Sequence, residues 1–260
     1  MTVLVTRILT AIIGIPVFLA AVYFGGLYLQ IGTALLVLVG LYELNRMHGG
    51  QGYWDYLILA GLSLLILAYT GVDPSFLAVW FAAQLVYLLV RATFTTGRPL
   101  MQMWQMAAVF YAAGLFSFLW LVNAEFGFIW SLFGIVTTWA TDTGAYFAGS
   151  AFGKTKLAPA ISPNKTREGS LGGIAAAAMA AVIFAVAADQ PVFYLILTAV
   201  FLSIIGQVGD LVESAMKRER EVKDSGTIFP GHGGVLDRFD SLLFVMPALY
   251  FILKYIPVFV

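Results

Sequence analysis

The stretch VFYLILTAVFLSIIGQVGDLVESAMKR, from Val192 to Arg218, decides the fold class because it joins a long apolar run to a polar end. The run Val192–Val208 approaches the ~20 predominantly apolar residues that a membrane-spanning helix needs. Gly209–Arg218 then continues out of the membrane with acids and bases. A span that ends in this way predicts polar chemistry at the surface of the bilayer.

The rest of the chain has the same character. Of its 260 residues, 61% are hydrophobic and 11% are charged, and the mean hydropathy is +0.91. A soluble domain is about 45–50% apolar and about 25% charged. The composition therefore excludes a soluble enzyme, a disordered chain and a nucleic-acid-binding protein. The chain has no cysteine and two histidines, which excludes disulfides, thiolate sites and a His-rich metal site.

We expect an all-α fold, a polytopic helical membrane protein with about nine transmembrane helices. Nine helices would use ~180 residues and leave no room for a separate soluble domain. The first run is kept as a span, because Ile15-Pro16 offers no small-residue cleavage site for a signal peptide. The predicted spans are Ile8–Phe24, Leu27–Leu41, Trp54–Val72, Phe76–Val90, Met106–Val122, Phe128–Phe147, Leu171–Ala188, Val192–Val208 and Leu242–Ile256.

The basic residues predict the orientation of the chain. When Arg7 is placed in the cytoplasm, all but one of the 14 lysines and arginines fall on that side, and Lys254 lies inside the last span. The opposite turns hold acidic residues such as Asp73, Glu125 and Asp189. The positive-inside rule therefore predicts a cytoplasmic N-terminus and a C-terminus outside.

Polar chemistry is concentrated in the second half. We expect residues 1–125 to form spans 1–5 and residues 126–260 to form a catalytic transmembrane region, spans 6–9. Its cytoplasmic loops, 150–170 and 209–241, carry most of the charge. The alanines Ala175–Ala178 and Ala180-Ala181 predict close helix packing, because small residues let backbones approach in lipid.

Asp142 lies inside the sixth predicted span, between Thr141 and Thr143. A carboxylate at membrane depth costs roughly 2.5–3.5 kcal/mol on insertion scales and usually faces a polar cavity. The alternative is a structural aspartate that is hydrogen-bonded to the neighbouring threonines or to a tyrosine. We therefore treat Asp142 as a candidate cavity residue.

The loop after the sixth span is a candidate anion site. Its segment AGSAFGKT, at 148–155, imitates a phosphate-binding P-loop but lacks the first glycine and follows an apolar helix, so we reject a P-loop. Asn164, Lys165 and Arg167 then precede a helix that should start near Gly169–Leu171. Helix N-terminal amides and fixed cations together bind anions. The alternative is an ordinary positive-inside loop.

Four polar side chains after the eighth span share one helix face, because they have the spacing i, i+3, i+4 and i+7. They are Asp210, Glu213, Ser214 and Lys217. A solvated salt-bridge face would explain Glu213 and Lys217, but not Asp210 at the membrane boundary. A glycine-rich loop follows, and further candidates there are Arg218, Lys223, Asp224, His232, Asp237, Arg238 and Asp240.

These residue types suit phosphoryl or nucleotidyl transfer. Aspartate oxygens suit Mg²⁺, which is usually held by one or two carboxylates plus substrate phosphates. Lysine and arginine neutralise phosphates directly, and glycines let the backbone approach closely. Catalysis of this kind is mostly positioning and charge neutralisation. His232 is either an acid/base or a hydrogen-bonded loop anchor.

The same region resembles the phosphatidate cytidylyltransferase (CDP-diacylglycerol synthase) family. The family pattern is met at Ser214, Lys217-Arg218, Lys223-Asp224, Gly226, Phe229-Pro230, His232-Gly233-Gly234, Asp237-Arg238 and Asp240. The Asp142 segment and the loop Ser162–Gly169 also resemble family segments, so the likeness covers about residues 140–240. The first five spans share only their apolar character with the family.

The resemblance implies that CTP and phosphatidate react to give CDP-diacylglycerol and pyrophosphate in phospholipid biosynthesis. It implies dependence on Mg²⁺, with Asp210 and Asp237 as the metal ligands, and a second, monovalent cation, K⁺. It also implies a homodimer with a cytoplasm-facing cavity. CTP, phosphatidate and membrane lipid are the expected partners, and nucleic acid is not. A short chain without a soluble tail is typical of bacteria, so we expect the cell's inner membrane.

The residues and the resemblance together assign three groups of roles. The expected catalytic residues are Asp210, Asp237, Lys217, Arg218 and Asp240. The expected ligands of substrate phosphates are Asn164, Lys165, Arg167, Ser214, Lys223, Arg238 and His232. The other expected cavity residues are Asp142, Glu213 and Asp224.

Two other functions compete with this interpretation. A secondary transporter could use Asp142 in a coupling-ion site, but the halves differ in charge and polar residues crowd one cytoplasmic face. A different membrane nucleotidyl- or phosphotransferase could act on a polyprenyl or other lipid phosphate. The acids and bases alone allow that enzyme, and only the family pattern argues against it.

Overall fold

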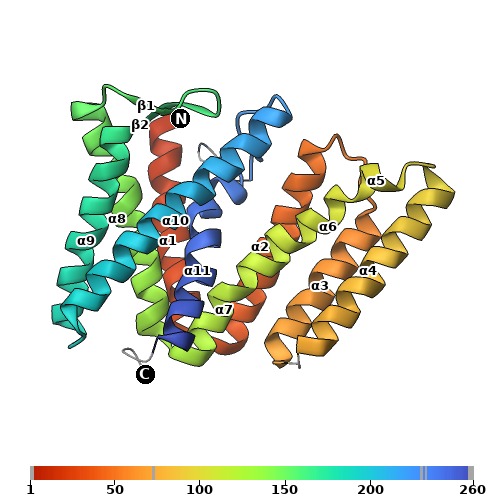
Figure 1. The fold of residues 1–260 in the computed structure, drawn as a ribbon, viewed down its shortest axis with the longest axis horizontal. Coiled ribbons are helices and arrows are strands. Elements are labelled where there is room, and N and C mark those ends of the chain that lie inside the picture. Colours follow the sequence, from red (N-terminus) through yellow and green to blue (C-terminus); the bar gives the residue numbers. More distant parts are fainter. Residues whose placement is uncertain (1–2, 72–73, 229–230, 232, 257–260) are drawn as a thin grey trace. The chain divides into compact units, whose positions relative to one another are not determined.

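The computed structural model describes residues 3–71, 74–228, 231 and 233–256, and these are almost entirely helical (Figure 1). Each of the nine predicted apolar runs lies on helix, the fifth on α6, a π-helical turn η1 and α7, and Val72, the predicted end of the third, lies outside the described residues. The elements are α1 (Val3–Phe24), α2 (Gly26–Met47), α3 (Trp54–Thr70), α4 (Pro74–Thr95), α5 (Pro99–Gln102), α6 (Trp104–Val109), η1 (Phe110–Gly114), α7 (Leu115–Phe126), α8 (Phe128–Phe152), β1 (Lys156–Ala158), β2 (Ser162–Thr166), α9 (Arg167–Ala187), α10 (Val192–Glu219) and α11 (Leu236–Tyr255).

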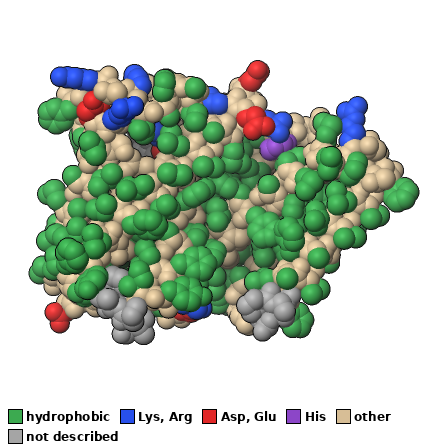
Figure 2. All heavy atoms as spheres, in the orientation of Figure 1, with side chains coloured by type: hydrophobic (Ala, Val, Ile, Leu, Met, Phe, Trp, Pro, Cys, Tyr) green, Lys and Arg blue, Asp and Glu red, His purple; other side chains and the backbone are tan. Residues whose placement is uncertain are grey.

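The described helices have the lengths and the surfaces of membrane spans. Five are long and apolar enough to cross a bilayer: Gly26–Met47, Phe76–Thr95, Pro99–Phe126, Arg167–Ala187 and Val192–Glu219. Figure 2 shows hydrophobic side chains along the helices and charged side chains at their ends. The protein is thus a helical multi-pass membrane protein. Nine crossings and the orientation of the termini remain predictions.

The chain forms two compact units. The first holds residues 1–121 and 225–235, and the second holds residues 122–224 and 236–260. The segment 225–235 therefore packs with the first unit, although the chain on both sides of it belongs to the second. The division into spans 1–5 and a catalytic region, placed at residue 125, stays a prediction.

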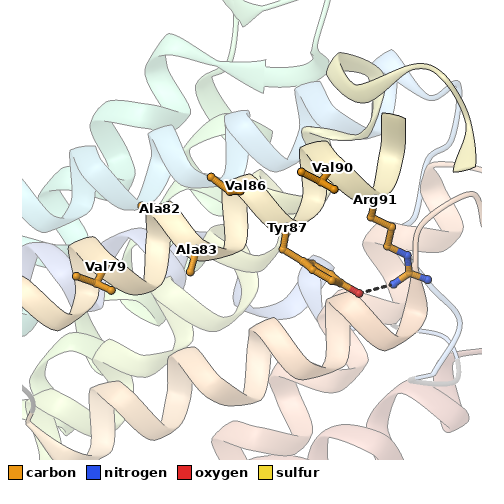
Figure 3. Close-up of a pocket in the computed structure, with 7 residues that line it drawn as sticks. All are labelled: Val79, Ala82, Ala83, Val86, Tyr87, Val90 and Arg91. Atoms are coloured by element: carbon orange, nitrogen blue, oxygen red, sulfur yellow. Dashed lines mark hydrogen bonds between the residues drawn. The ribbon is translucent and has the colours of Figure 1, made fainter. Parts of the chain in front are cut away.

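Polar contacts join the helices of the first unit. Arg91 of α4 forms an ion pair with Asp55 of α3 at 2.5 Å and donates to the Tyr87 hydroxyl at 3.2 Å. Figure 3 shows the second of these contacts at the end of an apolar strip on α4. Gln105 of α6 accepts a hydrogen bond from the Tyr53 amide at 2.7 Å, beside the start of α3. The first half thus contains more polar contacts than its sequence indicates.

Small residues pack α8 against α9 in the second unit. A Cβ on Gly144 would collide with Ala176, and a Cβ on Gly173 would lie 2.8 Å from the carbonyl oxygen of Thr141. The buried stripe of α9 is Gly169, Gly173, Ala177, Ala181 and Ala185. The close packing predicted from the alanines is therefore present.

Glycines also bring α10 against α11. A Cβ on Gly209 would lie 2.7 Å from the carbonyl oxygen of Asp240 and 2.7 Å from the ring of Phe244. One turn earlier, a Cβ on Gly206 would lie 3.1 Å from Val245. This close approach fixes the two helices beside each other at the position of Asp210.

The loop between α8 and α9 contains an antiparallel hairpin, β1–β2, which the sequence did not indicate. Thr166 ends β2 and caps α9, and its side-chain oxygen accepts a hydrogen bond from the Gly169 amide at 3.1 Å. Glu168 accepts hydrogen bonds from the amides of Lys154 and Thr155. The helix therefore begins at Arg167, before the predicted start, because the cap precedes the apolar run by several residues.

The glycine contacts predict a change in stability. Replacing Gly172 with Ala places a methyl group in collision with Ala148, and overpacking of this kind costs about 1–3 kcal/mol. The matched control is Gly32→Ala in α2, where a Cβ meets nothing within 4 Å. We expect the detergent-solubilised Gly172→Ala protein to unfold at a lower temperature than the wild type. The unfolding temperature of the Gly32→Ala control should not fall. Equal unfolding temperatures would contradict the packing.

Candidate active site

Five carboxylates gather in the second unit, where α8, α9, α10 and α11 are neighbouring helices (Figure 1). Asp240, near the start of α11, lies within electrostatic range of Asp210 and Glu213 on α10 and of Asp142 on α8. Glu213 is likewise within range of Asp237. The structure therefore brings together acids from α8, α10 and α11, although two helices separate α8 from α11 in the sequence.

Lys217 is buried among these acids. Its ammonium forms an ion pair with Glu213, one helical turn earlier on α10, and donates to Asp237 of α11 at 2.6 Å. The side chains of Lys217, Glu213 and Asp237 are 11%, 1% and 5% exposed. The interpretation of Glu213 and Lys217 as a solvated surface pair is therefore wrong, because the start of α11 covers both.

A second ion pair is more open. Lys165, on β2, lies 2.6 Å from an Asp210 oxygen, and these side chains are 27% and 30% exposed. The Ser214 hydroxyl donates to the other oxygen of Asp210 at 3.4 Å. Lys165 and Arg238 are also within electrostatic range of Asp142, whose side chain is exposed. The hairpin thus supplies a cation to the acidic cluster.

Arg218 makes contacts of a different kind. Its guanidinium donates to the carbonyl oxygen of Ile161 at 3.3 Å and to that of Val222 at 2.7 Å. These contacts join the hairpin to the end of α10, and the predicted catalytic role of Arg218 stays a prediction. Other predicted site residues lie exposed on the hairpin, on the helix starts or in the loop after α10: Asn164, Arg167, Lys223, Asp224 and Arg238. His232 lies outside the described residues.

The donor set fits a hard divalent cation that brings its own phosphate ligands. Within the described ranges, no group of three or more acidic or histidine side chains is arranged as a metal cage. Mg²⁺ does not need one, because one or two carboxylates and substrate phosphates are its usual ligands. Asp210 and Asp237 each place a carboxylate beside a lysine ammonium. This chemistry suits a metal–phosphate pair.

Glu43, at the end of α2, is a buried acid that the sequence interpretation missed. It accepts a hydrogen bond from the Ser225 hydroxyl at 2.9 Å and another from the Val235 amide at 2.8 Å. These contacts lie within the first unit. A signal was present, because an acid at the end of an apolar span is a functional candidate by default.

The Lys217 cluster predicts a large effect of losing its cation. Replacing Lys217 with Met leaves the buried carboxylates of Glu213 and Asp237 without the Lys217 cation. Breaking a buried ion pair in this way typically lowers the free energy of unfolding by about 3–5 kcal/mol. The control is Arg220→Met, because Arg220 lies 3.8 Å from an exposed Glu219 and such pairs contribute at most about 1 kcal/mol. Thermal unfolding in detergent should show a large loss for Lys217→Met and almost none for Arg220→Met. Similar losses of thermal stability in the two variants would contradict the buried ion pairs of Lys217.

Comparison with known proteins places the chain in a family. A family model described as "Cytidylyltransferase family" matches residues 5–256. A phosphatidate cytidylyltransferase of Bacillus subtilis (strain 168) is 42% identical, over 95% of this chain and 96% of its own length. Proteins of the same name from Staphylococcus saprophyticus and Staphylococcus haemolyticus are each 37% identical, over 95% of this chain and 98% of their own. The chain therefore belongs to the cytidylyltransferase family, with phosphatidate cytidylyltransferases among its relatives.

Proposed function

We propose that the protein is a phosphatidate cytidylyltransferase, which transfers the cytidylyl group of CTP to phosphatidate. The observation that carries the proposal is the cluster in which Lys165 and Lys217 meet Asp210 and Asp237. Family membership supports a cytidylyl donor, and the names of the relatives support phosphatidate as the acceptor. The products are CDP-diacylglycerol and pyrophosphate.

The reaction needs little covalent help from the protein. A phosphate oxygen of phosphatidate attacks the α-phosphorus of CTP, and the bond from that phosphorus to the oxygen bridging the β-phosphorus breaks. The electron pair leaves with pyrophosphate. The attacking oxygen is already anionic, so a strong general base is unnecessary. The residues of the chain therefore act by holding two polyanions together and neutralising their charge.

The two lysines have different roles in this proposal. Lys165 lies on the hairpin with its side chain 27% exposed and its ammonium nitrogen buried beside Asp210, so a substrate phosphate would have to displace Asp210 from this cation. Lys217 is enclosed by Glu213 and Asp237, so it holds the start of α11 and orients the carboxylate of Asp237. Mg²⁺ held by Asp210 and Asp237 would neutralise charge on the triphosphate and on the leaving pyrophosphate.

The other site residues complete the proposal. Arg238 and the exposed cations Arg167 and Lys223 neutralise substrate phosphates, and Asn164 contributes a polar contact beside Lys165. Asp142 and Asp240 add negative charge around the cation. K⁺, as a second cation, rests on the family resemblance alone.

The membrane arrangement is part of the same proposal. Nine crossings, with the N-terminus in the cytoplasm, place the cluster at the cytoplasmic surface of the inner membrane. CTP then reaches the site from the cytoplasm, while the acyl chains of phosphatidate stay in lipid. A homodimer is the proposed assembly. The apolar lengths of the helices and the concentration of basic residues in two loops support this arrangement.

The direct test is pyrophosphate release by the purified protein in detergent, given phosphatidate and CTP with and without Mg²⁺. ATP, GTP and UTP serve as nucleotide controls, and a polyprenyl phosphate serves as the acceptor control. We expect release that needs CTP, phosphatidate and Mg²⁺ together and that yields a CDP-lipid. Release with the polyprenyl phosphate alone would refute phosphatidate as the substrate, and release without CTP would refute cytidylyl transfer.

The proposed metal ligands give a second prediction. Asp237→Asn and Asp210→Asn keep the shape of each side chain but remove its charge, so turnover should fall by about 100-fold or more. Asp55→Asn, in the Arg91 ion pair of the first unit, is the matched control and should keep wild-type turnover. Size-exclusion chromatography of each variant checks folding. An active Asp237→Asn enzyme would contradict the metal assignment.

A further inference from the structure

The segment 225–235 is held by a carboxylate from a distant part of the chain. We infer that Glu43 is a positioning residue for turnover: it fixes this segment, and thereby the start of α11 that carries Asp237. The predicted effect on turnover rests on the proposed function. The predicted effect on hydrogen exchange does not depend on that function.

The contact is a buried, two-point hydrogen bond. Glu43 is fully buried, while Ser225 and Val235 are each 2% exposed. One oxygen of Glu43 accepts from the Ser225 hydroxyl at 2.9 Å, and the other accepts from the Val235 amide at 2.8 Å. The carboxylate therefore holds both ends of the segment at once. An ionised carboxylate is acceptor-only, and both partners can donate.

Glycines shape the segment around this carboxylate. A Cβ on Gly226 or on Gly234 would collide with the Glu43 side chain. These glycines directly follow Ser225 and directly precede Val235, the two hydrogen-bond donors. The segment thus approaches Glu43 closely at both ends, and a larger residue at either position would push the backbone away from it.

Chain connectivity carries the effect to the cluster. Val235 is bonded to Leu236, the first residue of α11, and Asp237 follows. Asp237 is held from its other side by Lys217 at 2.6 Å. Two fixed points, the Val235 amide and the Asp237 carboxylate, therefore lie on either side of one buried residue. Releasing the first removes one of these two points.

Three variants test the inference. Glu43→Ala removes both carboxylate oxygens, Glu43→Gln keeps one carbonyl oxygen for the Val235 amide, and Ser225→Ala removes one donor. Asp55→Asn is the control, because it removes a carboxylate of the same unit that is paired with Arg91. Each purified protein is assayed for kcat, for KM with CTP and with phosphatidate, and for the Mg²⁺ concentration that gives half-maximal rate.

A positioning role predicts a graded result. Loss of such a supporting contact typically costs 10–100-fold in activity or metal affinity, so Glu43→Ala should lower kcat by about that factor. The half-maximal Mg²⁺ concentration should rise, and both KM values should stay within about threefold. Glu43→Gln and Ser225→Ala should retain more activity than Glu43→Ala, and Asp55→Asn should match the wild type.

Hydrogen exchange measured by mass spectrometry gives the readout that needs no substrate. Peptides covering 225–240 should exchange faster in Glu43→Ala than in the wild type and at an intermediate rate in Glu43→Gln. An inactive wild-type protein would refute the proposed function but leave this comparison standing. The inference is overturned if Glu43→Ala turns over like the wild type, if its segment stays equally protected, or if Asp55→Asn loses as much activity.

Discussion

The buried ammonium of Lys217 is the interaction on which the second unit depends. Removing ions from water costs free energy, and a buried ion pair offsets this desolvation cost only when its partners are close and well oriented. Glu213 supplies one partner from the same helix, and Asp237 supplies the other from α11. Gly206 and Gly209 let the two helices come close enough for this pairing. The Lys217 ion pairs and the glycine contacts together place Asp210 and Glu213 of α10 near Asp237 and Asp240 of α11.

The two ion pairs of the cluster divide structural and substrate-binding work by their exposure. A buried pair such as Lys217–Asp237 holds helices together. If Lys217 moved to a substrate phosphate, Asp237 would lose a buried cation. The side chains of Lys165 and Asp210 are more exposed, at 27% and 30%, but the Lys165 nitrogen is buried, so an incoming phosphate must displace Asp210 to reach this cation. Glu43 repeats the buried arrangement with neutral donors. The chain thus uses buried polar contacts to fix the segments that carry its open, reactive groups.

The sequence predicts the helices and the acidic face of α10 well, because apolar length and the i, i+4 spacing are local signals. It also predicts the family, because the motif from Ser214 to Asp240 is dense in fixed positions. It does not predict that Glu43 meets Ser225 and Val235, since no local pattern joins residues so far apart in the sequence. The burial of Lys217 was missed for the same reason: its cover comes from α11. The contacts of Arg218 with the carbonyl oxygens of Ile161 and Val222 were likewise not predicted, because they depend on how the hairpin lies beside α10.

The central claim is that this cluster transfers a cytidylyl group and not a phosphoryl group to lipid. The most direct test gives the purified protein phosphatidate and CTP radiolabelled either at the α-phosphate or at the γ-phosphate, and then counts the lipid extract. We expect the α label to enter the lipid and the γ label to stay in water as pyrophosphate. Entry of the γ label into the lipid would contradict this expectation and would show a lipid kinase instead.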